Sequence, residues 1–226
     1  MQEKLTYKID QNIDCNPRPE MRAYPTSASI LLELGGLAMR FARVERVPRY
    51  NEKTRESDVE HSYMLALVAT ELAHSLYPAS LDTGLVSKYA IVHDLIEIKT
   101  GDVATFQISN VDLVQKEKIE HEALESLLAE LPPQTRSTLY NYELQADPES
   151  RFVRAIDKLL PVVVDILGAG RKVMNEDYGV HSPIQLGTAH NELRKRMAER
   201  FGEFPQVVAD HALLCELFEV EFGSIR

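Results

Sequence analysis

Residues 85–102 read LVSKYAIVHDLIEIKTGD, an apolar run that ends in a dense group of ionisable side chains. Apolar residues recur at three- and four-residue intervals through this run, which is the spacing of a buried helical face. Asp82 stands where a helix N-cap is favoured, and Gly101 stands where a helix end is favoured. The stretch therefore predicts one continuous helix that begins after Asp82 and ends near Thr100 and Gly101.

The same helical spacing recurs on both sides of this stretch, with prolines and glycines near the expected helix ends. Helices are predicted from Thr26 or Ser27 to about 41, from Ser57 or Asp58 to about Tyr77, and over about 113–131, 148–168, 188–202 and 205–220, with a short helix after Pro132–Pro133. The intervening residues 43–57, 103–112 and 179–187 are predicted loops. Because no stretch shows the alternation of a strand, the sequence predicts an all-α fold, a packed helical array.

Length indicates the domain organisation, and net charge limits the classes of ligand that the protein can bind. The 226 residues, 44% of them hydrophobic, fit an N-terminal arm over 1–25 and a single domain over 26–226, with its core at about 30–170 and C-terminal helices at about 188–220. Asp and Glu number 35 against 25 Lys and Arg, which gives a net charge of −10 and argues against binding to a nucleic acid polymer. A metal or an arginine can still hold a small phosphorylated ligand in an acidic protein.

Cysteine usage and hydropathy predict the cellular compartment of the protein. Cys15 and Cys215 lie near opposite ends and form no C-x-x-C pair, as is usual in a reducing compartment. No stretch approaches 18 apolar residues, and the first residues have no apolar signal region. We therefore expect a cytoplasmic protein that does not associate with a membrane.

His93 and Asp94 begin the ionisable group. A His-Asp pair alone is a weak indication, and a histidine at a helix end beside a solvated carboxylate is the plain alternative. Glu97, however, lies four residues after His93 and three after Asp94, so it shares their helical face, and Asp102 follows at the expected helix end. Carboxylates this close repel one another unless a cation is present. Imidazole with carboxylate suits Zn, Mn, Co, Ni or Fe.

Two more predicted helices carry further candidates. Asp157 interrupts an apolar face, and a buried carboxylate needs a partner, which a metal or a salt bridge to Lys158 would supply. His61 stands in ESDVEHS, at the first turn of its predicted helix, where a simple exposed position is the alternative.

Taken in order, these segments resemble a known family. The order RVPR (46–49), ESDVEHS (56–62), HDLIEIKTGD (93–102) and FVRAIDK (152–158) resembles the HD-domain superfamily, and within it the YfbR-like 5'-deoxynucleotidases and their eukaryotic HD-domain-containing-2 relatives. The resemblance covers about residues 30–170. It implies an HD-domain helical array with a buried mononuclear metal site, whose ligands match His61, His93, Asp94 and Asp157.

The resemblance also implies roles for residues around the metal. Glu97 matches the family's catalytic glutamate and Asp102 a second acidic residue, but which of the two acts as acid and which as base stays open. Arg46, 15 residues before His61, matches the arginine that contacts phosphate, with Arg43 as a nearby alternative.

The activity implied is metal-dependent release of phosphate from (deoxy)nucleoside 5'-monophosphates by a homodimer. The cofactor would be one divalent transition metal, Mn, Co, Zn, Ni or Fe, with Mg also allowed. Val47 replaces the aromatic residue that follows the arginine in bacterial relatives, which leaves base and sugar preference open. A deoxynucleoside triphosphate triphosphohydrolase, or another phosphoesterase using the same site, is the alternative. A non-catalytic nucleotide-binding HD module is less favoured because every expected position is filled.

Overall fold

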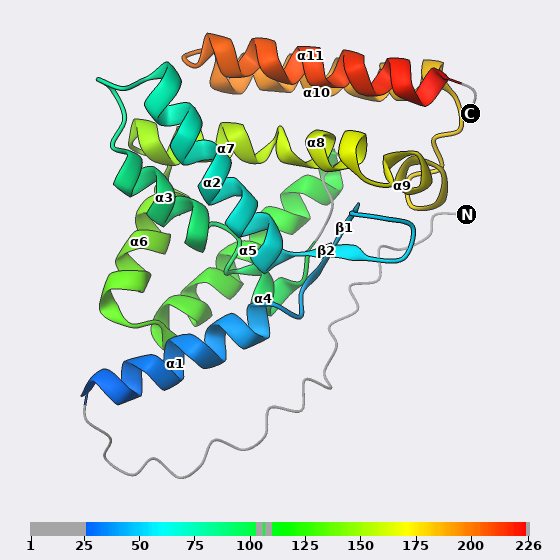
Figure 1. Cartoon of the computed structure of the whole chain (residues 1–226). Helices are drawn as coiled ribbons and strands as arrows, with labels where there is room; N and C mark the ends of the chain where they lie inside the picture. Colours follow the sequence, from blue (N-terminus) through cyan, green and yellow to red (C-terminus); the bar gives the residue numbers. More distant parts are fainter. Residues whose placement is uncertain (1–25, 103–105, 107–109, 225–226) are drawn as a thin grey trace.

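The computed structural model describes residues 26–102, 106 and 110–224, in which eleven helices surround a two-stranded sheet (Figure 1). The all-α class predicted from the sequence is confirmed, and the predicted arm over 1–25 lies outside the described residues. The elements are α1 Thr26–Phe41, β1 Glu45–Arg49, β2 Arg55–Ser57, α2 Asp58–Leu76, α3 Thr83–Val92, α4 Glu97–Thr100, α5 Asn110–Glu130, α6 Pro133–Leu144, α7 Pro148–Asp157, α8 Leu160–Leu167, α9 Gly170–Glu176, α10 Pro183–Phe201 and α11 Pro205–Gly223.

The loop predicted over 43–57 is wrong, because it contains a β-hairpin. Strands β1 and β2 pair antiparallel, with Glu45 opposite Ser57 at one end of the pairing. Burial alternates along β1, and its inward residues are Arg46 and Pro48. The period-two pattern of a strand is therefore present, but an arginine and a proline occupy the inward positions. An alternation of hydrophobic with polar residues does not reveal such a strand.

The single helix predicted from Asp82 to Gly101 is also wrong, because it is interrupted in the middle. α3 ends at Val92, and α4 begins at Glu97. Between them the backbone N–H of Leu95 donates to Val92 O at 3.1 Å and that of Glu97 to Asp94 O at 2.9 Å. These bonds to the carbonyl three residues earlier are the tight turns of a 3₁₀ helix. The interruption puts the His-Asp pair at the end of α3.

A second interruption divides the helix predicted over 148–168. α7 ends at Asp157 and α8 begins at Leu160, with Pro161 in its first turn. Proline has no N–H to donate, and inside a helix its ring clashes with the carbonyl four residues earlier, here that of Asp157. Pro161 therefore gives a physical reason for α7 to end at the residue that carries the candidate ligand.

The remaining helix boundaries differ less from the prediction. α5 begins at Asn110, three residues before the predicted start, and α10 begins at Pro183, inside the loop predicted over 179–187. α9 has no counterpart among the predicted helices. The assignment of residues 26–226 to a single domain stays a prediction.

The central core forms where α2, α3 and α7 pack together. Leu65 of α2 and Phe152 and Ile156 of α7 are fully buried in it. Complete burial of such a side chain contributes about 1.5–3 kcal/mol, so these three helices are held firmly in place. α10 and α11 lie side by side along the top of Figure 1. Within the described residues, no helix has both the length and the apolar character needed to cross a bilayer.

Candidate metal centre

Three helix ends bring the four predicted ligands together. His61 lies in the first turn of α2, the His93–Asp94 pair follows the last residue of α3, and Asp157 is the last residue of α7. The start of α2 is fixed by a capping box, in which the Ser57 side chain accepts from the Glu60 N–H and the Glu60 carboxylate accepts from the Ser57 N–H.

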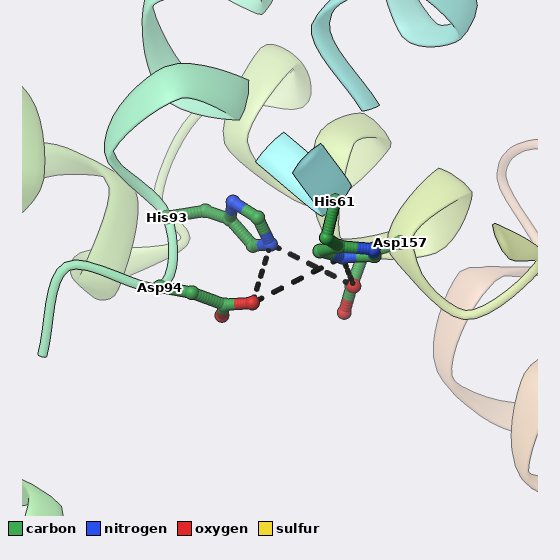
Figure 2. A group of neighbouring side chains, drawn as sticks. All are labelled: His61, His93, Asp94 and Asp157. Carbon is green, nitrogen blue, oxygen red and sulfur yellow. Dashed lines mark hydrogen bonds and ion pairs between the residues drawn. The ribbon is translucent and has the colours of Figure 1, made fainter. Parts of the chain in front are cut away.

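The four side chains point toward one another, as Figure 2 shows. His61 Nε2 lies 2.9 Å from Asp157 Oδ1 and 3.9 Å from Asp94 Oδ2. His93 Nε2 lies 2.8 Å from Asp94 Oδ2 and 3.7 Å from Asp157 Oδ1. One donor atom from each residue can be chosen so that all four lie within 4.8 Å of one another. The structure therefore brings together all four residues that the sequence predicted.

The chemistry of this group fits a divalent metal ion. Donor atoms each about 2.0–2.2 Å from one ion lie about 4 Å or less from one another, which is close to the spacing found here. The buried His93 Nε2 makes no hydrogen bond despite its short distance to Asp94. A donor set of two imidazole nitrogens and two carboxylate oxygens suits Zn, Mn, Fe, Co or Ni. Ca and Mg prefer sites whose donors are all oxygen.

The pKa values of the two imidazoles, His61 and His93, are shifted in opposite directions. Burial, together with the positive charge of Arg46, lowers the pKa of His61 to about 4, which leaves this ring neutral. Burial also disfavours protonation of His93, but the carboxylates of Asp94 and Asp157 outweigh it and raise the pKa of His93 to about 10. Although burial opposes ionisation of Asp94, the neighbouring His93 and Arg46 hold the pKa of this carboxyl below its usual range. The carboxylates of Asp94 and Asp157 are therefore ionised, as metal ligands must be, whereas His93 would release a proton on binding a metal.

Asp157 makes the salt bridge to Lys158 that was considered for it, and it also faces the candidate metal site. Its Oδ1 faces His61 and His93, while its Oδ2 accepts a hydrogen bond from Lys158 Nζ at 2.7 Å. Asp94 has the most exposed side chain of the four, at 18%, against 10% for Asp157 and 1% or less for the histidines. A ligand from solvent would therefore reach the cluster at Asp94.

Arg46 reaches the cluster from strand β1. Its Nη1 donates to Asp94 Oδ2 at 2.8 Å and to Asp58 Oδ1 at 3.3 Å, and its Nε lies 3.3 Å from Glu56 Oε2. The alternative candidate, Arg43, is exposed to solvent. The structure thus brings Arg46 next to the predicted metal ligands and leaves Arg43 on the surface.

The sequence did not single out Glu56 and Asp58, although both stand in the quoted segment ESDVEHS. Both side chains are fully buried, and Glu56 Oε2 also lies 3.6 Å from His61 Nδ1. Burial raises the pKa of each carboxyl to about 7 against the lowering influence of Arg46, and Asp94 also raises that of Asp58. Glu56 was predicted to lie in a loop and Asp58 at the start of a helix, so the burial of both carboxylates was not expected.

Glu97 lies in the same acidic group as the metal ligands. Glu97, Asp58 and Asp94 each offer an oxygen within 4.8 Å of the others, and Glu97 Oε2 is buried without a hydrogen-bond partner. Burial and the charges of Asp94, Asp102 and Asp58 raise the pKa of Glu97 well above its usual range. Asp102 follows Gly101, whose φ of 70° is a conformation that favours glycine, and it acts on the pKa of both Glu97 and Arg46.

Val47 follows Arg46 and is only partly buried, where it packs against a hydrophobic cluster. Phe106 and Tyr178 pack against the same cluster, with their ring centroids 4.6 Å apart. Burial raises the pKa of Tyr178, the charges of Asp165 and Asp102 raise it further, and the charge of Arg46 lowers it. Phe106 and Tyr178, from distant segments of the chain, therefore pack against the same hydrophobic cluster as Val47.

A family model for the HD domain matches residues 40–201 of this chain. The match covers more than half of the chain, and the chain belongs to the HD domain family. The resemblance read from the sequence is therefore confirmed, and the match extends beyond residue 170 into α10.

Curated relatives are 5'-deoxynucleotidases. The chain is 30% identical to HDDC2 of Danio rerio over 130 residues, which are 54% of this chain and 62% of the relative, and 30% identical to hdd1 of Schizosaccharomyces pombe over 111 residues, 46% and 53% of the two chains. It is 26% identical to the 5'-deoxynucleotidase of Erwinia tasmaniensis over 171 residues, 71% of this chain and 80% of the relative. The chain thus spans little more than half the length of the two eukaryotic relatives.

A solved structure has the same fold. The crystal structure of a predicted metal-dependent phosphohydrolase from Magnetospirillum magnetotacticum matches with a TM-score of 0.65 and 21% identity, over 89% of this chain and 99% of that one. At this identity the similarity establishes the fold.

Proposed function

We propose that this protein is a metal-dependent phosphohydrolase that releases phosphate from (deoxy)nucleoside 5'-monophosphates. The observation that supports it most is the convergence of two histidines and two aspartates from three helix ends, with Arg46 and Glu97 at the same cluster. The names of the three curated relatives, all 5'-deoxynucleotidases, support this substrate class.

In this proposal His61, His93, Asp94 and Asp157 hold one divalent transition metal. When bound, the metal would polarise a phosphoryl oxygen and lower the pKa of a water molecule. Arg46 binds the phosphate, because a guanidinium can contact two phosphate oxygens at once. Glu97 and Asp102 divide the proton transfers between the attacking water and the leaving 5'-oxygen. The raised pKa of Glu97 means that its buried carboxylate, once ionised, is a strong proton acceptor.

The charges around the cluster favour a monophosphate over a triphosphate. Among the described residues, the cationic side chains in contact with carboxylates of the cluster are Arg46 and Lys158. Arg49 and Arg55, which lie on the same hairpin, pair instead with Asp177. A triphosphate would bring additional negative charge close to several carboxylates, and two cations give it little compensation.

Oligomeric state and compartment belong to the same proposal. α2 exposes Val59, Tyr63 and Leu67 at four-residue intervals, with 36%, 72% and 62% of each residue accessible. An exposed apolar stripe of this kind is typical of a surface that another protein covers, which supports a homodimer. Cys215 is a free thiol, as expected for the reducing cytoplasm. Light scattering coupled to gel filtration tests the homodimer: a mass twice that of the chain is expected, and a monomer would exclude it.

The test of function is phosphate release from a panel of nucleoside mono-, di- and triphosphates with Mn, Co, Mg or Zn. We expect inorganic phosphate from the monophosphates, and loss of that activity in Asp94→Asn. Inorganic triphosphate from deoxynucleoside triphosphates would replace the proposal by the triphosphohydrolase alternative. Binding of nucleotides without turnover under any metal would indicate a non-catalytic HD module.

A further inference from the structure

Arg46 is held by carboxylates in a way that fixes the direction of its guanidinium group. The side chain is almost completely buried, with 8% of the residue accessible. Its Nη1 carries two hydrogens, and it has two acceptors, Asp94 Oδ2 at 2.8 Å and Asp58 Oδ1 at 3.3 Å. Its Nε faces Glu56 Oε2 at 3.3 Å.

Of the two terminal nitrogens of the guanidinium group, Nη2 is left for a ligand, while the buried Nε makes no hydrogen bond. Within the described residues, Nη2 of Arg46 donates no hydrogen bond, whereas both hydrogens of Nη1 are directed to carboxylates. Rotation of the group about its long axis would require breaking the contact with Asp58, with Asp94 or with Glu56. With Nη1 hydrogen-bonded to two carboxylates and Nε ion-paired with Glu56, the guanidinium presents Nη2 in one orientation.

Asp58 differs from the other two carboxylates that contact Arg46. Asp94 belongs to the proposed four-residue metal site, and Glu56 also faces His61. Asp58 is fully buried, uses Oδ1 for Arg46, and lies beside Glu97 and Asp94. An ionised carboxylate buried beside other acids is costly unless a cation compensates it, and Arg46 is the cation in contact with it.

We propose that Asp58 is a positioning residue for phosphate binding, which holds Nη1 of Arg46 so that Nη2 is presented to the phosphate group. The inference rests on the proposed function, since it assumes that Arg46 binds phosphate. It adds a role for a residue outside the four proposed metal ligands.

Two other roles for Asp58 are stabilising the start of α2 and repelling phosphate. Each predicts a different change in phosphate affinity when Asp58 is replaced. Asp58 is the first residue of α2, where a negative charge stabilises the helix dipole. If Asp58 serves the helix alone, replacing it lowers stability without changing phosphate affinity. If its negative charge opposes the phosphate, the replacement tightens phosphate binding. If Asp58 positions Arg46, its replacement weakens phosphate binding.

The test is titration of inorganic phosphate into the Mn-loaded protein by calorimetry, with metal content and thermal stability measured in parallel. We expect Asp58→Asn to weaken phosphate binding about tenfold and to keep its metal, because a neutral amide oxygen accepts a weaker hydrogen bond from the guanidinium than a carboxylate does. Glu60→Gln is the matched control, because Glu60 lies in the same first turn of α2 and does not contact Arg46; its phosphate affinity should equal that of the wild type.

A double-mutant cycle tests whether Asp58 acts through Arg46. Arg46→Lys removes both Nη1 and Nη2, so adding Asp58→Asn to it should weaken binding by less than about twofold more. Additive losses, an unchanged or tighter phosphate affinity in Asp58→Asn, loss of its metal, or no phosphate binding by the wild type would each overturn the proposal. If Asp58→Asn does not fold, Asp58→Glu keeps the charge but displaces it, and the same weakening is expected.

The phosphate titration also separates this inference from the proposed function. A wild type that cleaves no nucleotide, but whose phosphate affinity falls in Asp58→Asn, would refute the proposed function alone. A wild type that cleaves nucleoside monophosphates, with the phosphate affinity of Asp58→Asn unchanged, would refute the positioning role alone.

Discussion

The thermal stability of the protein should depend on divalent metal, and His93→Ala should remove that dependence. Four donor groups converge from the ends of α2, α3 and α7, the three helices that form the central core. An ion bound there links these helices in the folded state, and the unfolded chain offers no such site. Metal binding therefore adds to the free energy of unfolding.

The size of the effect follows from linkage and chain length. A ligand present at about 100 times its Kd stabilises the folded state by about 2.7 kcal/mol. For a domain of about 150–250 residues, 1 kcal/mol corresponds to about 2–4 °C in Tm. Saturating Mn should thus raise the Tm of the metal-free wild type by about 5–11 °C.

The assay is differential scanning calorimetry of metal-free protein with and without Mn. In His93→Ala the metal-induced rise should fall below about 2 °C, whatever the Tm of the metal-free variant. His74→Ala removes an exposed histidine of α2 and should keep the full rise. An equal metal-induced rise in wild type and His93→Ala would refute the assignment of His93 as a ligand.

Three further predictions test the chemistry, the pH dependence and the packing. Glu97→Gln should retain its metal by elemental analysis but lose about 100-fold or more in kcat for phosphate release, and retained turnover would remove Glu97 from the mechanism. Burial lowers the pKa of His211 from 6.5 to about 4, so below about pH 6.5 the unfolded chain binds a proton that the folded protein does not, and stability is lost as pH falls. In urea denaturation, the free energy of unfolding of the wild type should fall by about 2 kcal/mol more than that of His211→Gln between about pH 7.5 and pH 5. Equal losses in the two proteins would contradict this. A Cβ on Gly168 would lie 2.2 Å from Arg49 O, so Gly168→Ala should cost about 1–3 kcal/mol in calorimetry, whereas Gly35→Ala, in helix α1 with no atom within 4 Å, should be neutral or stabilising by up to about 1 kcal/mol.

The candidate site residues could be predicted from the sequence because their chemistry is visible in short segments. His93, Asp94 and Glu97 stand within five residues, and Asp157 interrupts an apolar run in which a lone carboxylate needs a partner. Their meeting point could not be derived from spacing, because it depends on how three helices pack. That step came from the resemblance to a family, and the structure brings the four residues together.

The two helix interruptions show where periodicity is insufficient. Apolar spacing continues through Pro161, so it predicts one helix although α7 ends at Asp157. Likewise the spacing continues through His93 and Asp94, where the backbone changes to 3₁₀ turns. Both interruptions lie at candidate ligands, and the apolar spacing of the sequence gives no sign of either.

The roles of Glu56 and Asp58 could not be predicted because they depend on the hairpin. Charged residues between helices usually lie in solvent, and the inward residues of the two strands include Arg46 and Glu56 rather than apolar side chains. Burial of these charges makes sense once they are seen to pair with each other. Such mutual compensation depends on three-dimensional contacts that a single sequence does not specify.

The most direct test of the metal centre is anomalous X-ray scattering from a crystal of the protein loaded with Mn. We predict one strong anomalous peak within coordination distance of His61 Nε2, His93 Nε2 and a carboxylate oxygen of both Asp94 and Asp157. A peak at another position, or no peak at these four residues under conditions that support phosphate release, would contradict the account.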